Sequence, residues 1–186
     1  KEIWDHYGSY PSCPGWYFTH ETRHRRFHFR EIYKELSEYA KKITPRKPVL
    51  ISPFYPSKKI YGDEALAPEE FGDNWRQMLK GVHTIDYAAF QDGTARLNEL
   101  GSYLHQAKLV MDELGIELWN NVETFTREMP IKFPPIDFRE LREKLIISAK
   151  YATKNITFEF SHFMSPNSCY LAARNLYQRY REYLKL

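Results

Sequence analysis

Five short runs of apolar and β-branched residues recur along the chain, each entered through turn residues and left through polar ones. This pattern predicts β-strands near 16–21, 49–53, 83–91, 116–123 and 156–161. Apolar residues at helical spacing fill the intervals, for example Ile32, Leu36 and Tyr39, or the leucines that lead up to Gly115. A strand followed by a helix, five times over in units of roughly 35 residues, is typical of parallel βαβ units.

The two faces of the predicted strands differ in polarity. Alternate side chains of a strand point to opposite faces, so Tyr17, Thr19 and Glu21 share one face of the first strand. In 116–123 an apolar set (Ile116, Leu118, Asn120, Val122) alternates with a polar set (Glu117, Trp119, Asn121, Glu123), and in 156–161 the apolar set is Ile156, Phe158 and Phe160.

This asymmetry selects among α/β folds. A doubly wound sheet is apolar on both faces, whereas a barrel has a helix-covered outside and an inside that opens to solvent at one end. The sequence therefore predicts an α/β chain that forms part of a TIM (β/α)8 barrel, with an open parallel sheet as the alternative.

We expect a single domain over residues 1–186, because no shift in composition divides the chain. A complete barrel needs about 250 residues and eight βα units, and only five are seen here. Five strands leave two unpaired edges. The expectation is therefore the C-terminal part of a barrel, completed by N-terminal βα units of the same protein or by a second chain.

Composition excludes several classes of protein. The 27 basic and 24 acidic residues give a net charge of +3, too balanced to indicate nucleic-acid binding. No apolar run reaches the ~18 residues of a membrane span, and two cysteines cannot build a disulfide scaffold. The sequence indicates no cofactor and no metal site. Its aromatic content of 16% favours a stacking surface.

Two carboxylates fall at predicted strand ends. Active groups of such barrels lie at the carboxyl ends of the strands, which is where Glu21 and Glu123 are expected. Glycoside hydrolysis uses a pair of acids, one to protonate the leaving oxygen and one to attack or to activate water. A retaining mechanism predicts a separation of about 5–5.5 Å, and an inverting one about 6.5–9.5 Å.

Other side chains at the strand ends suit a carbohydrate ligand. Flat rings support the apolar faces of sugars, and amide, carboxylate or imidazole groups bind hydroxyls. An alternative for Asp92 is a purely structural role, in a turn or as a helix cap. The candidate binding residues are Phe54, Tyr55, Gln91, Asp92, Trp119, Asn121 and His162, with Phe125 and Phe163 close to the same mouth.

Four phrases of the sequence resemble a known family. They are Gly15–Glu21, Leu50–Tyr55, Phe90–Gly93 and Leu118–Phe125. They look like a family of exported bacterial barrels catalogued as domain of unknown function 4434, which is itself similar to retaining glycoside hydrolases. The resemblance implies a glycoside hydrolase-like protein outside the cytoplasm, periplasmic or secreted, with Glu21 matching the acid/base and Glu123 the nucleophile. The hydrolases usually place Asn before the acid/base, where this chain has His20.

Two rival hypotheses remain. A non-catalytic carbohydrate-binding barrel would use the same aromatic mouth without turnover. The segment His20-Glu21-Thr22-Arg23-His24 also fits H-E-x-x-H, the zinc peptidase signature, which requires both histidines on one helix face. The basic residues between Arg23 and Arg30 would suit an anionic group, or would form an ordinary solvated loop.

Overall fold

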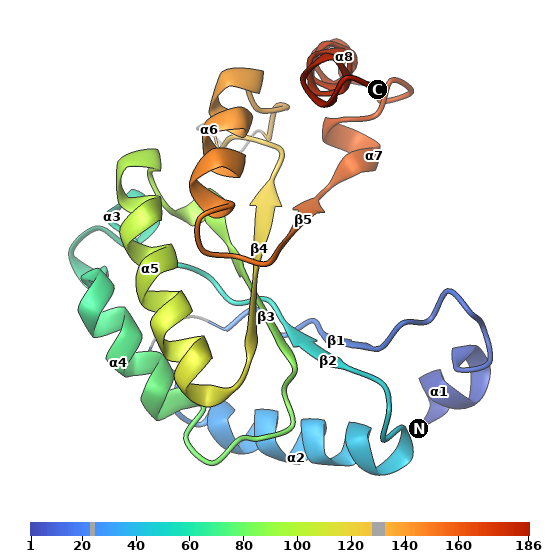
Figure 1. Ribbon diagram of the computed structural model, residues 1–186, viewed down its shortest axis with the longest axis vertical. Helices are drawn as coiled ribbons and strands as arrows, with labels where there is room; N and C mark the ends of the chain where they lie inside the picture. The colour runs from blue at the N-terminus through green and yellow to red at the C-terminus, as the bar shows by residue number, and fades with distance from the viewer. Residues whose placement is uncertain (23–24, 128–132) are drawn as a thin grey trace.

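The computed structural model describes residues 1–22, 25–127 and 133–186. Its centre is a parallel five-stranded sheet in which the order of the strands follows the chain (Figure 1). The strands are β1 (Trp16–Phe18), β2 (Val49–Ile51), β3 (Tyr87–Gln91), β4 (Glu117–Glu123) and β5 (Lys154–Phe158). The sheet is open, and the predicted succession of parallel strands is confirmed.

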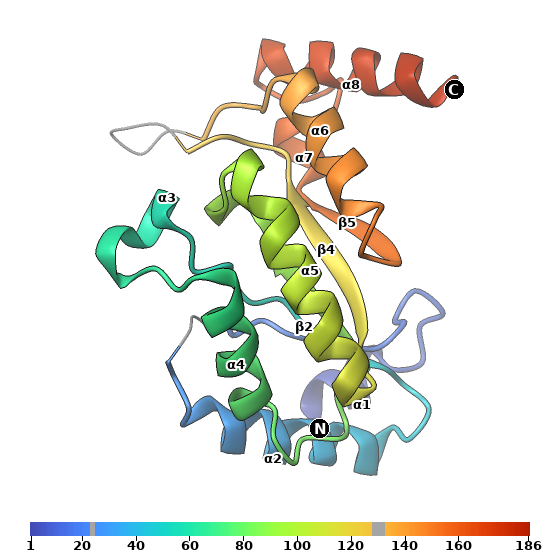
Figure 2. The same ribbon diagram turned by 60° about the vertical axis from the view of Figure 1, so that its left-hand side comes forward.

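Helices follow the strands as the apolar spacing predicts. The long ones are α2 (Phe29–Ile43), α4 (Pro68–Met78), α5 (Leu97–Leu114), α6 (Phe138–Ser148) and α8 (Leu171–Leu184). Short helices α1 (Glu2–Tyr7), α3 (Lys58–Tyr61) and α7 (Phe160–Phe163) and the 3-10 turns η1 (Gly62–Glu64) and η2 (Asp92–Thr94) complete the described elements. Helices α2, α4, α5 and α6 lie along one side of the sheet (Figures 1 and 2).

The core lies between the sheet and these helices. Ile51, Ala88, Phe90 and Leu118 point from the strands toward the helices and are almost fully buried. Helix α5 ends where Gly115 adopts φ +70°, the left-handed geometry that glycine adopts without steric cost. No helix formed by the described residues covers the other face of the sheet, so side chains on that face are available for a site.

The apolar residues whose spacing predicts α2 are not the ones that pack this helix against the core. Ile32, Leu36 and Tyr39 lie on its exposed side, while Tyr33 and Ala40 face the core. Tyr33 is polar at its tip, where its hydroxyl shares a hydrogen bond of 2.6 Å with Thr22 Oγ1.

The predicted faces of the last strand are wrong. Ile156 pairs with Asn121 and Phe158 with Glu123 in the β4–β5 register, so Ile156 and Phe158 lie on the helix-free face. A one-residue shift reverses every side chain of a strand, and β5 is an exposed edge strand that periodicity alone does not orient.

Candidate active site

A pocket opens on the helix-free face at the carboxyl ends of the strands, with a volume of about 450 Å³. It contains both predicted acids, and we call it the glutamate pocket. Its lining residues are Tyr17, Thr19, Glu21, Gln91, Asn121, Glu123, Phe125, Arg127, Phe133, Phe158 and Phe163. Segments that are a hundred residues apart in sequence meet here because parallel strands end at one edge of the sheet.

The backbone of Glu123, at the end of β4, is held on both sides. Its N–H donates to Asp92 Oδ1 over 3.0 Å, and its carbonyl accepts from Lys144 Nζ over 3.0 Å. Lys144 and Asp92 form a buried ion pair at 2.8 Å, and Asn120 Nδ2 donates to the second Asp92 oxygen. This network fixes the backbone position from which the Glu123 side chain extends.

The Glu123 carboxylate is only 2% exposed. Its Oε1 lies 3.5 Å from Arg127 Nη2, and its Oε2 has no hydrogen-bond partner among the described residues. The guanidinium of Arg127 packs against the rings of Phe125 and Phe133 at 5.8 and 5.9 Å. Burial raises the pKa of Glu123, and Arg127 works against that rise.

This burial predicts that Glu123→Gln stabilises the fold at neutral pH. A carboxyl whose pKa is raised by folding costs stability as pH rises above its unfolded value of about 4.3. The neutral amide avoids that cost, so we expect a gain of about 1 kcal/mol at pH 7 and none below pH 4. Urea unfolding of the natural protein and of Glu123→Gln, each at pH 7 and below pH 4, measures this difference in the free energy of unfolding.

Glu117→Gln is the matched control on the same face of β4. Its exposed carboxylate accepts from Thr153 and Trp119, which lowers its pKa. Removing that charge should leave stability unchanged or slightly reduce it at pH 7. A loss of stability in Glu123→Gln equal to that of the control would contradict the prediction.

Glu21 lies on the loop that follows β1, and its side chain is exposed. Strand β1 ends at Phe18, three residues before the predicted end. The next residue after Glu21, Thr22, is buried, and its carbonyl accepts from the Phe54 N–H over 3.4 Å. The loop is therefore anchored immediately beside Glu21.

Gln91 and Asn121 share a support in the glutamate pocket. Gln91 Nε2 donates to the Ser52 carbonyl over 2.8 Å, and Asn121 Nδ2 donates to Ser52 Oγ over 3.2 Å. The Asn121 Oδ1 has no partner among the described residues. The hydroxyl of Tyr17 also contacts Ser52, and burial together with the charge of Glu21 raises the pKa of Tyr17. These groups form a polar wall beside the acids.

Five of the seven predicted binding residues lie outside the glutamate pocket, namely Phe54, which lines the pocket described next, and the four whose contacts follow. Tyr55 is fully buried against Phe90, Asp92 is buried with Lys144, and Trp119 stacks on Tyr87 at 4.3 Å. His162 lies in α7, exposed and paired with Glu159. Their side chains therefore contact other parts of the protein and do not line the glutamate pocket. Asp92 lies in the turn η2, as one alternative expected, but its carboxylate pairs with Lys144 and caps no described helix.

Phe54 lines a second pocket, which has a volume of about 310 Å³ and which we call the basic pocket. It is lined by His20, Glu21, Thr22, Arg26, His28, Phe29, Phe54 and Tyr61. Glu21 therefore lines both pockets.

Sequence reasoning missed several residues of the glutamate pocket. Tyr17 and Thr19 share the face of Glu21, so alternation along the first strand could have found them. Arg127, Phe133 and Phe158 had no such signal, because the loop after β4 and the register of β5 place them.

The zinc signature lacks its structural context in the residues that can be described. His20, Glu21 and Thr22 form no helix, while Arg23 and His24 lie outside the described residues. Within ranges 1–22, 25–127 and 133–186, no group of three or more His, Cys, Asp or Glu side chains could hold a metal ion.

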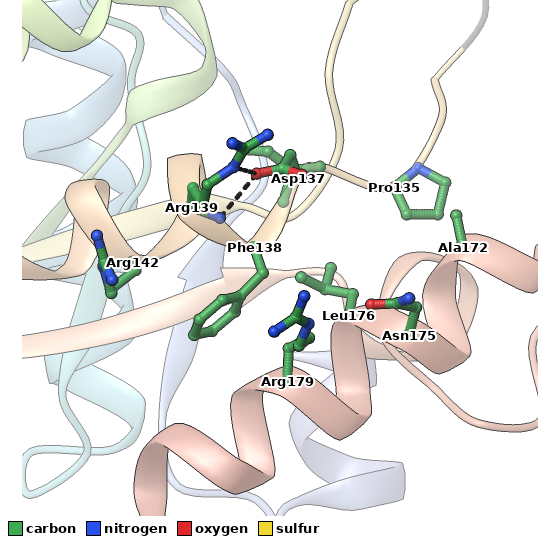
Figure 3. Close-up of a pocket in the computed structure, with 10 residues that line it drawn as sticks. Pro135, Asp137, Phe138, Arg139, Arg142, Ala172, Asn175, Leu176 and Arg179 are labelled. Atoms are coloured by element: carbon green, nitrogen blue, oxygen red, sulfur yellow. Dashed lines mark hydrogen bonds and ion pairs between the residues drawn. The ribbon is translucent and has the colours of Figure 1, made fainter.

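A further pocket, with a volume of about 630 Å³, is lined by residues of α6, of α8 and of the segment before α6, and by neither glutamate (Figure 3). Arg139, Arg142 and Arg179 line it, and Asp137 caps α6 and pairs with Arg139 at 3.1 Å. It shares no lining residue with the glutamate pocket.

No helix among the described residues is long and apolar enough to cross a membrane.

Solved structures define the class of fold. A protein of Bacteroides thetaiotaomicron described as a "putative alpha-L-fucosidase" is 39% identical over 99% of this chain, with a TM-score of 0.93. The endo-beta-1,4-mannanase of Thermotoga petrophila is 13% identical, with a TM-score of 0.53 over 77% of this chain and 34% of its own. The chain is an α/β protein of the TIM-barrel class, seen here as five βα units with an open sheet.

The family follows from the sequence. Residues 1–170 match the family described as Domain of unknown function (DUF4434), and the chain belongs to this family. It spans 58% of the length of the Bacteroides protein. No curated protein sequence matches it significantly.

Proposed function

We propose that the protein hydrolyses glycosidic bonds with retention of configuration, using Glu123 as nucleophile and Glu21 as acid/base. The observation that carries the proposal is that the glutamate pocket brings both acids to one solvent-open cavity at the strand ends. One Glu123 oxygen has no hydrogen-bond partner among the described residues, which supports a chemical role.

The proposed reaction has two steps. In the first, a Glu123 oxygen attacks the anomeric carbon while the bond from that carbon to the leaving oxygen breaks, and Glu21 gives that oxygen its proton. In the second, Glu21 takes a proton from water, the water oxygen attacks the same carbon, and the bond to Glu123 breaks. Two inversions at one carbon give net retention.

The surroundings of the two acids suit these different roles. A nucleophile must be ionised, and Arg127 at 3.5 Å favours the charged form of Glu123 against the effect of burial. Glu21 is exposed at the border of two pockets, where it can exchange protons with water and reach a bond that bridges both.

We propose α-L-fucosides as the first substrates to test, since the 39% identical protein is described as a "putative alpha-L-fucosidase". Phe125, Phe133, Phe158 and Phe163 line one wall of the glutamate pocket. A wall of phenyl rings suits the apolar face and methyl group of a 6-deoxy sugar. We also propose that the protein acts outside the cytoplasm.

The test is hydrolysis of 4-nitrophenyl α-L-fucoside, with other aryl glycosides alongside, by the full natural protein. Glu123→Gln should lower kcat by at least about 1000-fold, equivalent to roughly 4 kcal/mol of barrier, while sugar binding measured by calorimetry changes little. Glu117→Gln, on the same face but outside the pocket, should keep full activity. Proton NMR should show retention at the anomeric centre.

Each alternative has its own outcome. Inverted product would overturn the nucleophile role of Glu123. Sugar binding without turnover of any aryl glycoside would instead support the carbohydrate-binding barrel and reject hydrolysis.

A further inference from the structure

The basic pocket adjoins the glutamate pocket through Glu21, which lines both. An acid that protonates a leaving oxygen must lie at the bond that is cleaved. If Glu123 marks the pocket of the sugar that is attacked, the basic pocket lies where the departing part of the substrate would be held. This step rests on the function proposed above.

The polar lining of the basic pocket is dominated by cationic and imidazole groups. Arg26 is exposed, and its side chain forms no ion pair or hydrogen bond with any described residue. The ring of His20 stacks on Phe29 with centroids 4.2 Å apart, and His28 contacts the same ring at 4.5 Å. Phe29 thus holds both imidazoles at the pocket while the guanidinium stays free to bind.

Among the described residues that line the basic pocket, Glu21 is the only acid. In the proposed first step Glu21 is protonated and therefore neutral, so no described lining residue offsets the charge of Arg26. A guanidinium with two imidazoles beside it is suited to carboxylate or sulfate oxygens. The rings of Phe29 and Phe54 add flat apolar surface against which a sugar ring can lie.

We propose that the basic pocket binds the leaving-group part of the substrate and that this part is a sugar carrying an anionic group, a carboxylate or a sulfate ester. The protein would then cleave a neutral sugar from an acidic one. Arg26 is the group that selects for the negative charge.

The test compares aryl glycosides that share one sugar but differ in the leaving group, which is 4-nitrophenol or the same phenol with a carboxylate or a sulfate. We expect the natural protein to favour a charged leaving group about fivefold to tenfold in kcat/KM, less so at high salt. Arg26→Gln should remove the preference. Arg25→Gln, the adjacent arginine outside the pocket, should keep it. The two charged substrates separate carboxylate from sulfate recognition.

Other outcomes overturn the inference. An unchanged preference in Arg26→Gln, or an equal loss in Arg25→Gln, would show that the pocket does not select charge. Failure to cleave any of the substrates would reject the hydrolase function itself. Anion binding is then tested by following the NMR signals of His20 and His28 as glucuronate or galactose 6-sulfate is added. Shifts of these signals in the natural protein that do not occur in Arg26→Gln would still support anion binding. If the signals do not shift in the natural protein, anion binding is rejected.

Discussion

Lys144→Met is expected to destabilise the fold by about 3–5 kcal/mol, the usual cost of leaving a buried charge without its partner. Lys144 is 2% exposed and Asp92 is fully buried. Among the described residues, removing the ammonium leaves the Asp92 carboxylate with donors from Asn120 and the Glu123 N–H only. It also strips the Glu123 carbonyl of its Lys144 hydrogen bond. The substitution therefore weakens the support of the proposed nucleophile as well as the fold.

Denaturant unfolding of the natural protein and of Lys144→Met at pH 7 measures the loss in the free energy of unfolding. Lys108→Met is the matched control, since Lys108 pairs with Asp112 on an exposed face of α5, and surface pairs contribute at most about 1 kcal/mol. The double variant Lys144→Met with Asp92→Leu should recover part of the loss, because the orphaned charge is gone. A loss no larger than that of Lys108→Met would contradict the assigned ion pair.

Gly93→Ala is expected to displace the Glu123 carboxylate while the protein still folds. A Cβ built at Gly93 would lie 1.5 Å from Glu123 Oε2 and 2.3 Å from its Cδ. The obstructing atoms are the end of a flexible side chain, so the carboxylate moves instead of the backbone. A shift of about 1 Å in a reacting group can cost about 100-fold in rate. We expect at least that loss in kcat, with a smaller change in KM.

Gly101→Ala separates this effect from general disturbance. Gly101 lies inside α5, and its added Cβ would meet only Ile147 Cγ2 at 3.7 Å, an ordinary contact. This variant should keep full activity and gain about 0.5–1 kcal/mol from helix propensity. Full activity of Gly93→Ala would show that the position of the Glu123 carboxylate does not matter to the reaction.

The sequence was most informative where strands were regular. Alternation along 116–123 correctly set Asn121 and Glu123 on the face away from Leu118 and Val122. The same reasoning put Trp119 on that face, and it is there, but two residues nearer the start of the strand than Asn121 and stacked on Tyr87. The alternation of side chains shows on which face of the sheet a residue lies, but not how far along the strand it is from the carboxyl end.

Strand-end position did not separate ligand-facing residues from core residues. Tyr55 and Asp92 follow their strands as a binding residue would, yet Tyr55 packs with Phe71, Phe90 and Tyr103. Whether such a side chain turns inward or toward the helices depends on partners far away in the chain, which a local pattern does not contain.

The local pattern by itself determined the βα succession, the parallel sheet and the face on which Glu123 lies, because period-2 and helical spacings reflect burial that acts within each element. Only the tertiary structure decided that Lys144 and Asp92 hold the Glu123 backbone, that Gly93 leaves room for its carboxylate, and that Arg127 supplies its counter-charge. These contacts join residues from separate βα units, and their geometry is set by how the helices and loops pack around the strand ends.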